Sequence, residues 1–310
     1  MENQIKTENE IKQESIFIPV NDTDKLHLKR FYKNTEGPVV FMLHGSIENG
    51  KIFYSSSGKG LAPYLANNGF DVFIADLRGR GQSTPAINKD SAYGQTEAIT
   101  EDLPAFIEKI REIRGDTRQH WIAHSWGGIM LLSVLSRFSK YCEFVDSLVF
   151  LGARRRITVL NLEKLIKINF FWYFFGFIMV KRHGFLPAKK IGFGSDNETA
   201  KSHAQSTVWV KGKPWVDPQD NFNYEKAFKK IKIPPLLLLT GTGDHCLANT
   251  KDIIKFYNEI GNENTKYQFI GKKFGNKNDY DHINLLTHQD AINDHFPIVL
   301  EWIKETNLKI

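Results

Sequence analysis

The chain alternates short, largely apolar segments with amphipathic ones, and this alternation restricts its fold more than any other feature. "PVVFML" (38–43), "DVFIAD" (71–76) and "LLLLT" (236–240) have the composition of strands that are buried on both faces. Between such runs, "LAPYLANNGF" (61–70) and "ITEDLPAFIEKIREIRG" (99–115) carry apolar residues at helical spacing. Buried strands that alternate with helices predict an α/β fold, in which flanking helices cover a mostly parallel sheet.

Eight strands are expected in this sheet, and the first two are expected to form a pair at the start of the chain. The expected strands are 15–20, 25–32, 38–43, 71–76, 119–124, 145–153, 236–240 and 266–271. The expected helices are 61–69, 99–115, 127–140, 250–261 and, approximately, 291–305.

The alternation stops after residue 151 and resumes near residue 232. The segment between them, 152–231, begins with three arginines, continues with an aromatic run and ends in a polar stretch that contains glycines. We therefore expect it to be an inserted cap or lid over one end of the sheet. The remaining expected parts are a charged tail at 1–14 and two core segments at 15–151 and 232–310.

Composition and charge exclude several classes of protein. With 310 residues the chain is long enough for one large α/β domain or two small ones. The net charge of +6 is mildly basic, but Lys and Arg are spread along the chain, so we expect no nucleic-acid partner. Cys142 and Cys246 are the only cysteines, too few for a disulfide framework or a structural metal site.

The beginning of the chain and its most apolar run bear on where the protein is found. "MENQIKTENEIKQE" is polar and lacks the apolar core of a secretory signal peptide. The apolar run 170–180 has 11 residues, well short of the ~20 that a membrane-spanning helix needs. We expect a cytoplasmic protein, and peripheral membrane attachment or export without a cleaved signal are the alternatives.

The segment "HWIAHSWGG" (120–128) contains the candidate nucleophile, Ser125. A strand-like stretch precedes it and a helix-like stretch follows it, as in the Gly-x-Ser-x-Gly turn that exposes a nucleophilic serine. Ala123 stands where the strict motif has its first glycine, and Gly127 fills the second small position. The alternative is that Ser125 only caps a helix.

An acid and a histidine follow this serine in the order that such a hydrolase requires. Asp244 lies in "GTGDHCL" after the strand 236–240, and His282 lies in the loop beyond the last expected strand. His288 is the main alternative base, and His245 and His295 are weaker ones. We assign the oxyanion hole to the backbone N–H groups of Ser46, in the "HGS" loop, and Trp126.

These segments together resemble the α/β-hydrolase superfamily. "HGS" (44–46), "DLRGRGQS" (76–83), the serine turn, "GTGD" (241–244) and "DHINLL" (281–286) match it in order and spacing, closest to the acid-lipase and serine-esterase branches. The resemblance implies hydrolysis of a carboxylic ester through an acyl-enzyme, without cofactor or metal.

What the resemblance implies for individual residues is a triad of Ser125, Asp244 and His282. Two alternatives stay open: the same triad could cleave a peptide, thioester, lactone or polyester bond, or the fold could serve a non-catalytic ligand-binding protein.

The aromatic run within the insertion predicts an apolar acyl pocket. The residues expected to bind the substrate are Phe170, Phe171, Trp172, Phe174 and Phe175. Cationic residues flank the run, which suits contact with an anionic membrane surface. The expected partners are therefore a small-molecule or lipid ester and, peripherally, an anionic membrane. The sequence assigns no oligomeric state.

Overall fold

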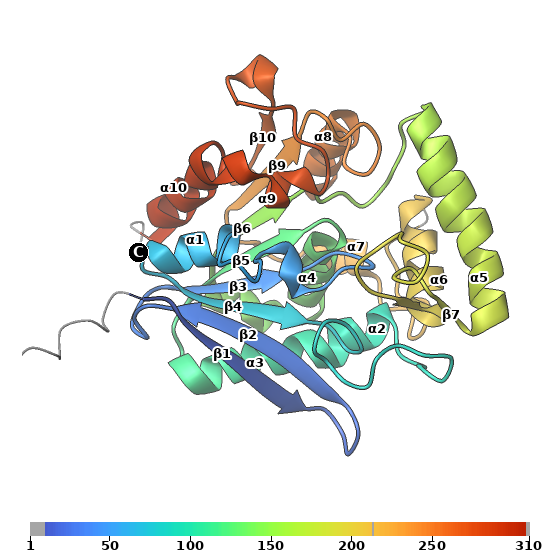
Figure 1. The fold of residues 1–310 in the computed structure, drawn as a ribbon, viewed down its shortest axis with the longest axis horizontal. Coiled ribbons are helices and arrows are strands. Elements are labelled where there is room, and N and C mark those ends of the chain that lie inside the picture. Colours follow the sequence, from blue (N-terminus) through green and yellow to red (C-terminus); the bar gives the residue numbers. More distant parts are fainter. Residues whose placement is uncertain (1–9, 213, 308–310) are drawn as a thin grey trace, which may run out of the picture.

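A computed structural model describes residues 10–212 and 214–307 of the chain, and it contains an eight-stranded sheet (Figure 1). The strands follow the spatial order β1-β2-β4-β3-β5-β6-β9-β10. The pairs β1–β2 and β2–β4 are antiparallel and all other pairs are parallel. The strands are β1 Lys12–Pro19, β2 Lys25–Tyr32, β3 Val39–Leu43, β4 Asp71–Asp76, β5 Gln119–His124, β6 Val145–Leu151, β9 Leu236–Gly241 and β10 Thr265–Ile270.

The central strands are buried along their whole length. Every residue of β3, β4, β5, β6 and β9 is shielded from solvent, because helices pack on both faces of the sheet. This confirms the mostly parallel, eight-stranded sheet that the apolar runs predict.

Helices cover the two faces in separate sets. Apolar side chains of α3, α4 and α8 pack on one face and those of α1 and α10 on the other. The α-helices are α1 Leu61–Asn67, α2 Gln95–Glu97, α3 Leu103–Arg114, α4 Trp126–Arg137, α5 Gly176–His183, α6 Ala200–Val210, α7 Tyr224–Phe228, α8 Thr250–Ile260, α9 Asn284–Thr287 and α10 Phe296–Asn307. Four segments are 3₁₀-helices: η1 Gly50–Ile52, η3 Ser139–Phe144, η5 Lys272–Phe274 and η6 Gln289–Asn293. Two are π-helices: η2 Ala98–Asp102 and η4 Lys164–Phe175.

The segment 152–231 contributes η4, α5, α6, α7 and a two-stranded sheet of β7 (Phe185–Leu186) and β8 (Glu198–Thr199). In Figure 1, α5 and α6 stand to one side of the main sheet, beyond the carboxyl ends of its central strands. That this segment acts as a separate cap or lid stays a prediction.

Two boundaries differ from those expected. β1 begins at Lys12, inside the segment 1–14 expected to be a tail, because β1 pairs with the full length of β2 from Lys12 opposite Tyr32. Residues 1–9 of that expected tail lie outside the described residues. The last α-helix begins at Phe296 rather than near Ala291, with Pro297 in its first turn, where a missing N–H is tolerated.

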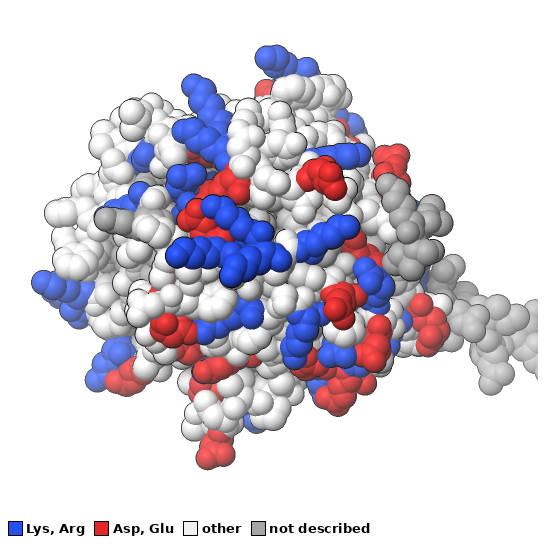
Figure 2. Space-filling view, turned by 180° about the vertical axis from the view of Figure 1, so that it is seen from behind, with Lys and Arg blue, Asp and Glu red and all other residues white. Residues whose placement is uncertain are grey.

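The surface mixes both signs of charge. Figure 2 shows acidic and basic side chains interspersed over one face of the molecule. Within the described part of the chain, no helix has the length and apolar character needed to cross a bilayer.

A buried charge cluster ties the sheet together at the amino ends of its parallel strands. Asp71, the first residue of β4, is fully buried and accepts two hydrogen bonds at 2.8 Å from Arg30 of β2. Arg114, at the end of α3, pairs with the same carboxylate and also donates to the Gly37 carbonyl oxygen at 3.1 Å. The cluster therefore joins β2, β4 and α3 far from the carboxyl edge of the sheet.

Replacing Asp71 by alanine removes the carboxylate that the buried Arg30 and the partly buried Arg114 share. We expect the free energy of unfolding to fall by about 3–5 kcal/mol, because a buried charge left without its partner is strongly destabilising. The control is Glu112→Ala, which removes an exposed pair with Lys109 at 2.7 Å and should change the stability by about 0.5 kcal/mol or less. Urea denaturation followed by tryptophan fluorescence measures both variants, and equal losses would contradict this account.

Candidate active site

Ser125 lies at a sharp turn between β5 and α4. Its φ of 51° and ψ of −123° are unusual for a residue with a side chain, and such strain is typical of functional turns. Its N–H donates to the Leu151 carbonyl oxygen at 2.8 Å, which fixes the turn against β6. A side chain at Gly127 would lie 2.5 Å from the His44 carbonyl oxygen, so only glycine fits there. Ala123 instead belongs to β5 and is fully buried in the core, so a methyl group is accommodated at that position.

The structure brings Ser125, His282 and Asp244 into one hydrogen-bonded chain. His282 Nε2 lies 2.9 Å from the Ser125 Oγ, and His282 Nδ1 lies 2.6 Å from the Asp244 Oδ2. A carboxylate only accepts, so Nδ1 carries the proton and Nε2 is left to accept from the serine hydroxyl. All three residues are buried. Asp244 lies in the turn just beyond the end of β9, and His282 lies in the loop between η5 and α9.

Burial biases His282 toward its neutral form. Burial lowers the pKa of His282, and the neighbouring His124 and Arg154 lower it as well, while Asp244 opposes them. For Asp244, burial would raise the pKa, but the charge and hydrogen bond of His282 outweigh it and lower the value to about 2. The acid is therefore ionised and the imidazole is a free base at neutral pH.

The backbone amides of Ser46 and Trp126 lie beside this group. Both residues line the same cavity as Ser125 and His282. Neither N–H donates to an acceptor within residues 10–212 and 214–307, so both remain available to a bound ligand. Gly45 lies close to Ser125: an added Cβ at Gly45 would be 2.9 Å from the serine Cβ. The absence of a side chain at Gly45 therefore allows the two loops to approach each other.

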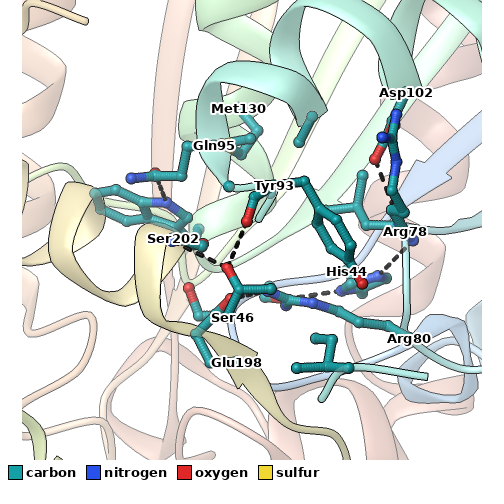
Figure 3. A pocket seen from close by; sticks show the side chains of 18 residues that line it. His44, Ser46, Arg78, Arg80, Tyr93, Gln95, Asp102, Met130, Glu198 and Ser202 are labelled. Carbon is teal, nitrogen blue, oxygen red and sulfur yellow. Dashed lines mark hydrogen bonds and ion pairs between the residues drawn. The ribbon is translucent and has the colours of Figure 1, made fainter. Parts of the chain in front are cut away.

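A polar network holds the loop that carries Ser46. His44 Nδ1 donates to the Gly45 carbonyl oxygen at 2.8 Å, and His44 Nε2 accepts from the Leu77 N–H at 3.2 Å. Arg80 donates to the same Gly45 oxygen at 3.3 Å and pairs with the buried Glu198 (Figure 3). The pocket among these side chains is about 30 Å³, far too small for an ester substrate, so its polar groups position the loop.

A second histidine–carboxylate pair, which the sequence does not reveal, lies against the first. Glu48 accepts from His124 Nδ1 at 2.8 Å and from the Gly45 N–H at 2.9 Å. His124 Nε2 donates to the backbone oxygen of His282 at 3.0 Å, so both ring nitrogens carry protons. Burial lowers the pKa of His124, but Glu48 outweighs this and raises it, while His124 lowers the pKa of Glu48 to about 2 against its own burial. The pair links the loop of Gly45 and Ser46 to the loop of His282.

A cavity of about 580 Å³ opens beside Ser125 and His282 and has mostly apolar walls. Its apolar lining includes Ile157, Ile168, Trp172, Phe193, Val210 and Leu247.

Of the five aromatic residues expected to bind the substrate, the structure brings only Trp172 to this wall. Phe170, Phe171 and Phe174 are exposed on the outer side of η4, and Phe175 is half-buried. A run of consecutive aromatic residues surrounds a helix, so only residues on the inner side of η4 reach the cavity, and these are Lys167, Ile168 and Trp172.

The alternative bases lie elsewhere. His288 stands 3.7 Å from Asp290 and packs edge-on against Tyr280. The buried His295 bonds the Leu285 carbonyl oxygen through Nε2 at 2.6 Å. No group of three His, Cys, Asp or Glu side chains that could hold a metal ion occurs among the described residues.

Comparison with known proteins identifies a family and several similar sequences. The sequence profile of the alpha/beta hydrolase fold matches residues 38–289. Similar sequences include the lipase lipl-3 of Caenorhabditis elegans, 30% identical over 34% of this chain and 28% of that lipase. The human lysosomal acid lipase/cholesteryl ester hydrolase is 27% identical over 37% of this chain and 31% of that protein. The matched segments thus span less than a third of these relatives.

Solved structures resemble most of the chain at low sequence identity. A Pyrococcus furiosus esterase superposes with a TM-score of 0.59 at 16% identity and covers 95% of this chain and 91% of its own. The thioesterase domain from the curacin biosynthetic pathway gives 0.57 at 15% identity, with 93% and 99% covered. These likenesses show the fold, and the profile spans most of the chain. This protein therefore belongs to the α/β hydrolase fold family.

Proposed function

We propose that the protein is a serine hydrolase that cleaves carboxylic esters with an apolar acyl group. The observation that carries the proposal is the hydrogen-bonded chain of Ser125, His282 and Asp244 at the wall of an apolar cavity. A serine with a neutral imidazole at its hydroxyl and an ionised carboxylate behind it is the arrangement that activates a nucleophile.

The proposed reaction has two halves. The Ser125 oxygen attacks the ester carbonyl carbon while His282 Nε2 takes the hydroxyl proton, and the Ser46 and Trp126 N–H groups stabilise the oxyanion. Collapse of this intermediate breaks the bond to the alcohol, which leaves with the proton from His282. A water then loses its proton to His282 and attacks the acyl-serine, which releases the acid and restores the hydroxyl.

Two observations support an apolar ester as the substrate. The cavity volume of about 580 Å³ and its aliphatic and aromatic walls suit a medium-sized apolar chain. Several relatives are named lipases, although they match only part of their length. Cleavage of a thioester, lactone, peptide or polyester would form the same kind of acyl-serine intermediate. A panel of these substrates therefore has to identify the bond that is cleaved.

We also propose that the cap contacts an anionic membrane surface. Large apolar side chains stand exposed on and before η4 and along α5: Leu160, Leu162, Leu165, Ile166, Phe170, Phe171, Phe174, Phe177 and Ile178. Lys181 and Arg182 are exposed at the end of α5, next to this apolar face. Exposed rings with cationic neighbours are typical of helices that lie in a lipid interface.

Ser125→Ala should lower the hydrolysis of p-nitrophenyl octanoate by at least about 10⁴-fold, since no other group replaces the nucleophile. The matched control is Ser133→Ala in α4, whose buried hydroxyl bonds the Ile129 carbonyl oxygen and lies outside the cavity wall. A spectrophotometric assay with purified protein measures both variants. Comparable turnover by Ser125→Ala and the unmodified protein would refute the assignment.

The same assay over acyl chains of increasing length tests the size of the substrate. Activity should rise from acetyl to octanoyl esters, and a maximum at acetyl would exclude the large apolar pocket. Thioester, lactone and peptide substrates compared in parallel decide among the alternative bonds.

The activity should persist below the ordinary histidine pKa of about 6.5. Burial and the facing cations His124 and Arg154 lower the pKa of His282, while Asp244 raises it. Because protonated His282 cannot accept the serine proton, kcat/KM should fall only as the pH drops through that lowered value. Asp244→Asn should move the midpoint lower still and reduce the rate by about 10⁴-fold. A pH–rate profile with its acid midpoint above 7 would disagree with this electrostatic account.

Membrane contact can be measured by co-sedimentation with phosphatidylserine-containing vesicles. The double change Phe170→Ser and Phe174→Ser should weaken binding about 10-fold or more, because both rings leave the lipid interface. Phe274→Ser serves as the control, because Phe274 is similarly exposed (50%, against 49% for Phe170 and 59% for Phe174) but lies in η5. Equal binding by all three proteins, unaffected by salt, would argue against this surface.

A further inference from the structure

Three consecutive arginines follow β6, and the first differs from the other two. Arg155 donates through Nε to Glu259 at 2.6 Å, and Arg156 pairs with the same carboxylate at 3.3 Å. Arg154 is only 5% exposed, and its Nε finds no acceptor. Across residues 10–212 and 214–307, Arg154 forms no ion pair and no hydrogen bond.

The carboxylates nearest to Arg154 are committed to other partners. Asp244 accepts from His282, and Asp252 accepts from the N–H of Thr158 at 2.8 Å and from its hydroxyl. Both acids raise the pKa of Arg154, but burial outweighs them and lowers it. A guanidinium does not lose its proton in a protein, so Arg154 is a buried cation that forms no ion pair with any carboxylate of the described residues. An unpaired buried cation is strongly destabilising unless a bound anion pairs with it.

Arg154 lines the same cavity as Ser125 and His282. Lys51 stands on its wall as well, and Lys167, also on the wall, pairs with Glu163 at 2.6 Å. The acid on the wall, Glu48, is neutralised by His124. An anion that enters therefore meets a cation in surroundings of low polarity, where charge pairing is stronger than in water.

Resting on the ester hydrolysis proposed above, we propose that the substrate carries its own terminal oxyanion, a carboxylate or a phosphate-type group, which binds Arg154. The apolar chain of the substrate fills the cavity, and its ester carbonyl lies at Ser125. The planar guanidinium suits this task, because its parallel N–H groups bind two oxygens of a carboxylate or phosphate at once. The substrate class is thus a charged amphiphilic ester rather than a neutral one.

A pair of substrates of equal chain length tests the proposal. Mono-p-nitrophenyl suberate ends in a carboxylate, and p-nitrophenyl octanoate ends in a methyl group in nearly the same place. Arg154→Gln should lower the suberate-to-octanoate ratio of kcat/KM by about 10- to 100-fold, as expected for a lost hydrogen bond to a charged group. The p-nitrophenyl ester of 7-phosphonoheptanoate, assayed in parallel, shows whether the site prefers a carboxylate or a phosphorus oxyanion.

Two further variants keep the result interpretable. Arg156→Gln makes the same change two residues on, where the side chain is 38% exposed and outside the cavity wall, and should leave the ratio unchanged. Arg154→Lys keeps the positive charge but lacks the planar guanidinium, so it should give an intermediate ratio. This variant also tests the proposal if Arg154→Gln does not fold. If every Arg154 variant slows both esters equally, the arginine acts on His282 and Asp244 alone and the proposal is overturned.

A binding measurement tests the anion site independently of the proposed hydrolysis. Calorimetric titration of the Ser125→Ala protein with the two esters measures affinity without turnover. We expect the suberate ester to bind more tightly than the octanoate ester, and the added change Arg154→Gln to remove the difference. If the unmodified protein hydrolyses neither ester but this binding difference is found, the anion site stands and the hydrolase function falls. Equal affinities with and without Arg154 overturn the anion site.

Discussion

The parallel register of the central strands is the constraint on which the site depends. Leu43 of β3 pairs with Ala123 of β5, and His124 of β5 pairs with Leu151 of β6, so these strands end at one level. Their loops then meet at a single edge of the sheet. Because of this, the Ser46 loop, the Ser125 turn and the loops of Asp244 and His282 can share hydrogen bonds despite their separation in sequence.

Buried charge governs how this edge is organised. One ion pair, Glu48 with His124, joins the backbone of Gly45 to that of His282 and so connects the loop of Ser46 to the loop of His282. Asp244 orients the imidazole from the other side. Within the described part of the chain Arg154 is left without an ion pair, and its position on the cavity wall is the basis for the anionic ligand proposed here.

The sheet could be predicted from sequence because each buried strand shows its burial directly, as in the apolar segments that became β3, β4 and β9. The serine turn was predictable because it lies between a recognisable strand and a recognisable helix, and the acid and the histidine because each lies in a loop that follows a recognisable strand. The inner side of η4 was not, since a run that is aromatic all around a helix carries no sign of which side faces the cavity. The Glu48–His124 pair and the unpaired state of Arg154 depend on contacts between distant segments, and residue type alone does not indicate them.

The most direct measurement of the central claim is covalent trapping of the nucleophile. The folded, unmodified protein is incubated with a fluorophosphonate, digested and mapped by mass spectrometry. An activated hydroxyl hydrogen-bonded to His282 predicts one phosphonyl group per chain, located on Ser125, and none on the same serine when the protein is unfolded in urea before labelling. Absence of label on Ser125 in the folded protein, or equal labelling of other serines, would contradict the account.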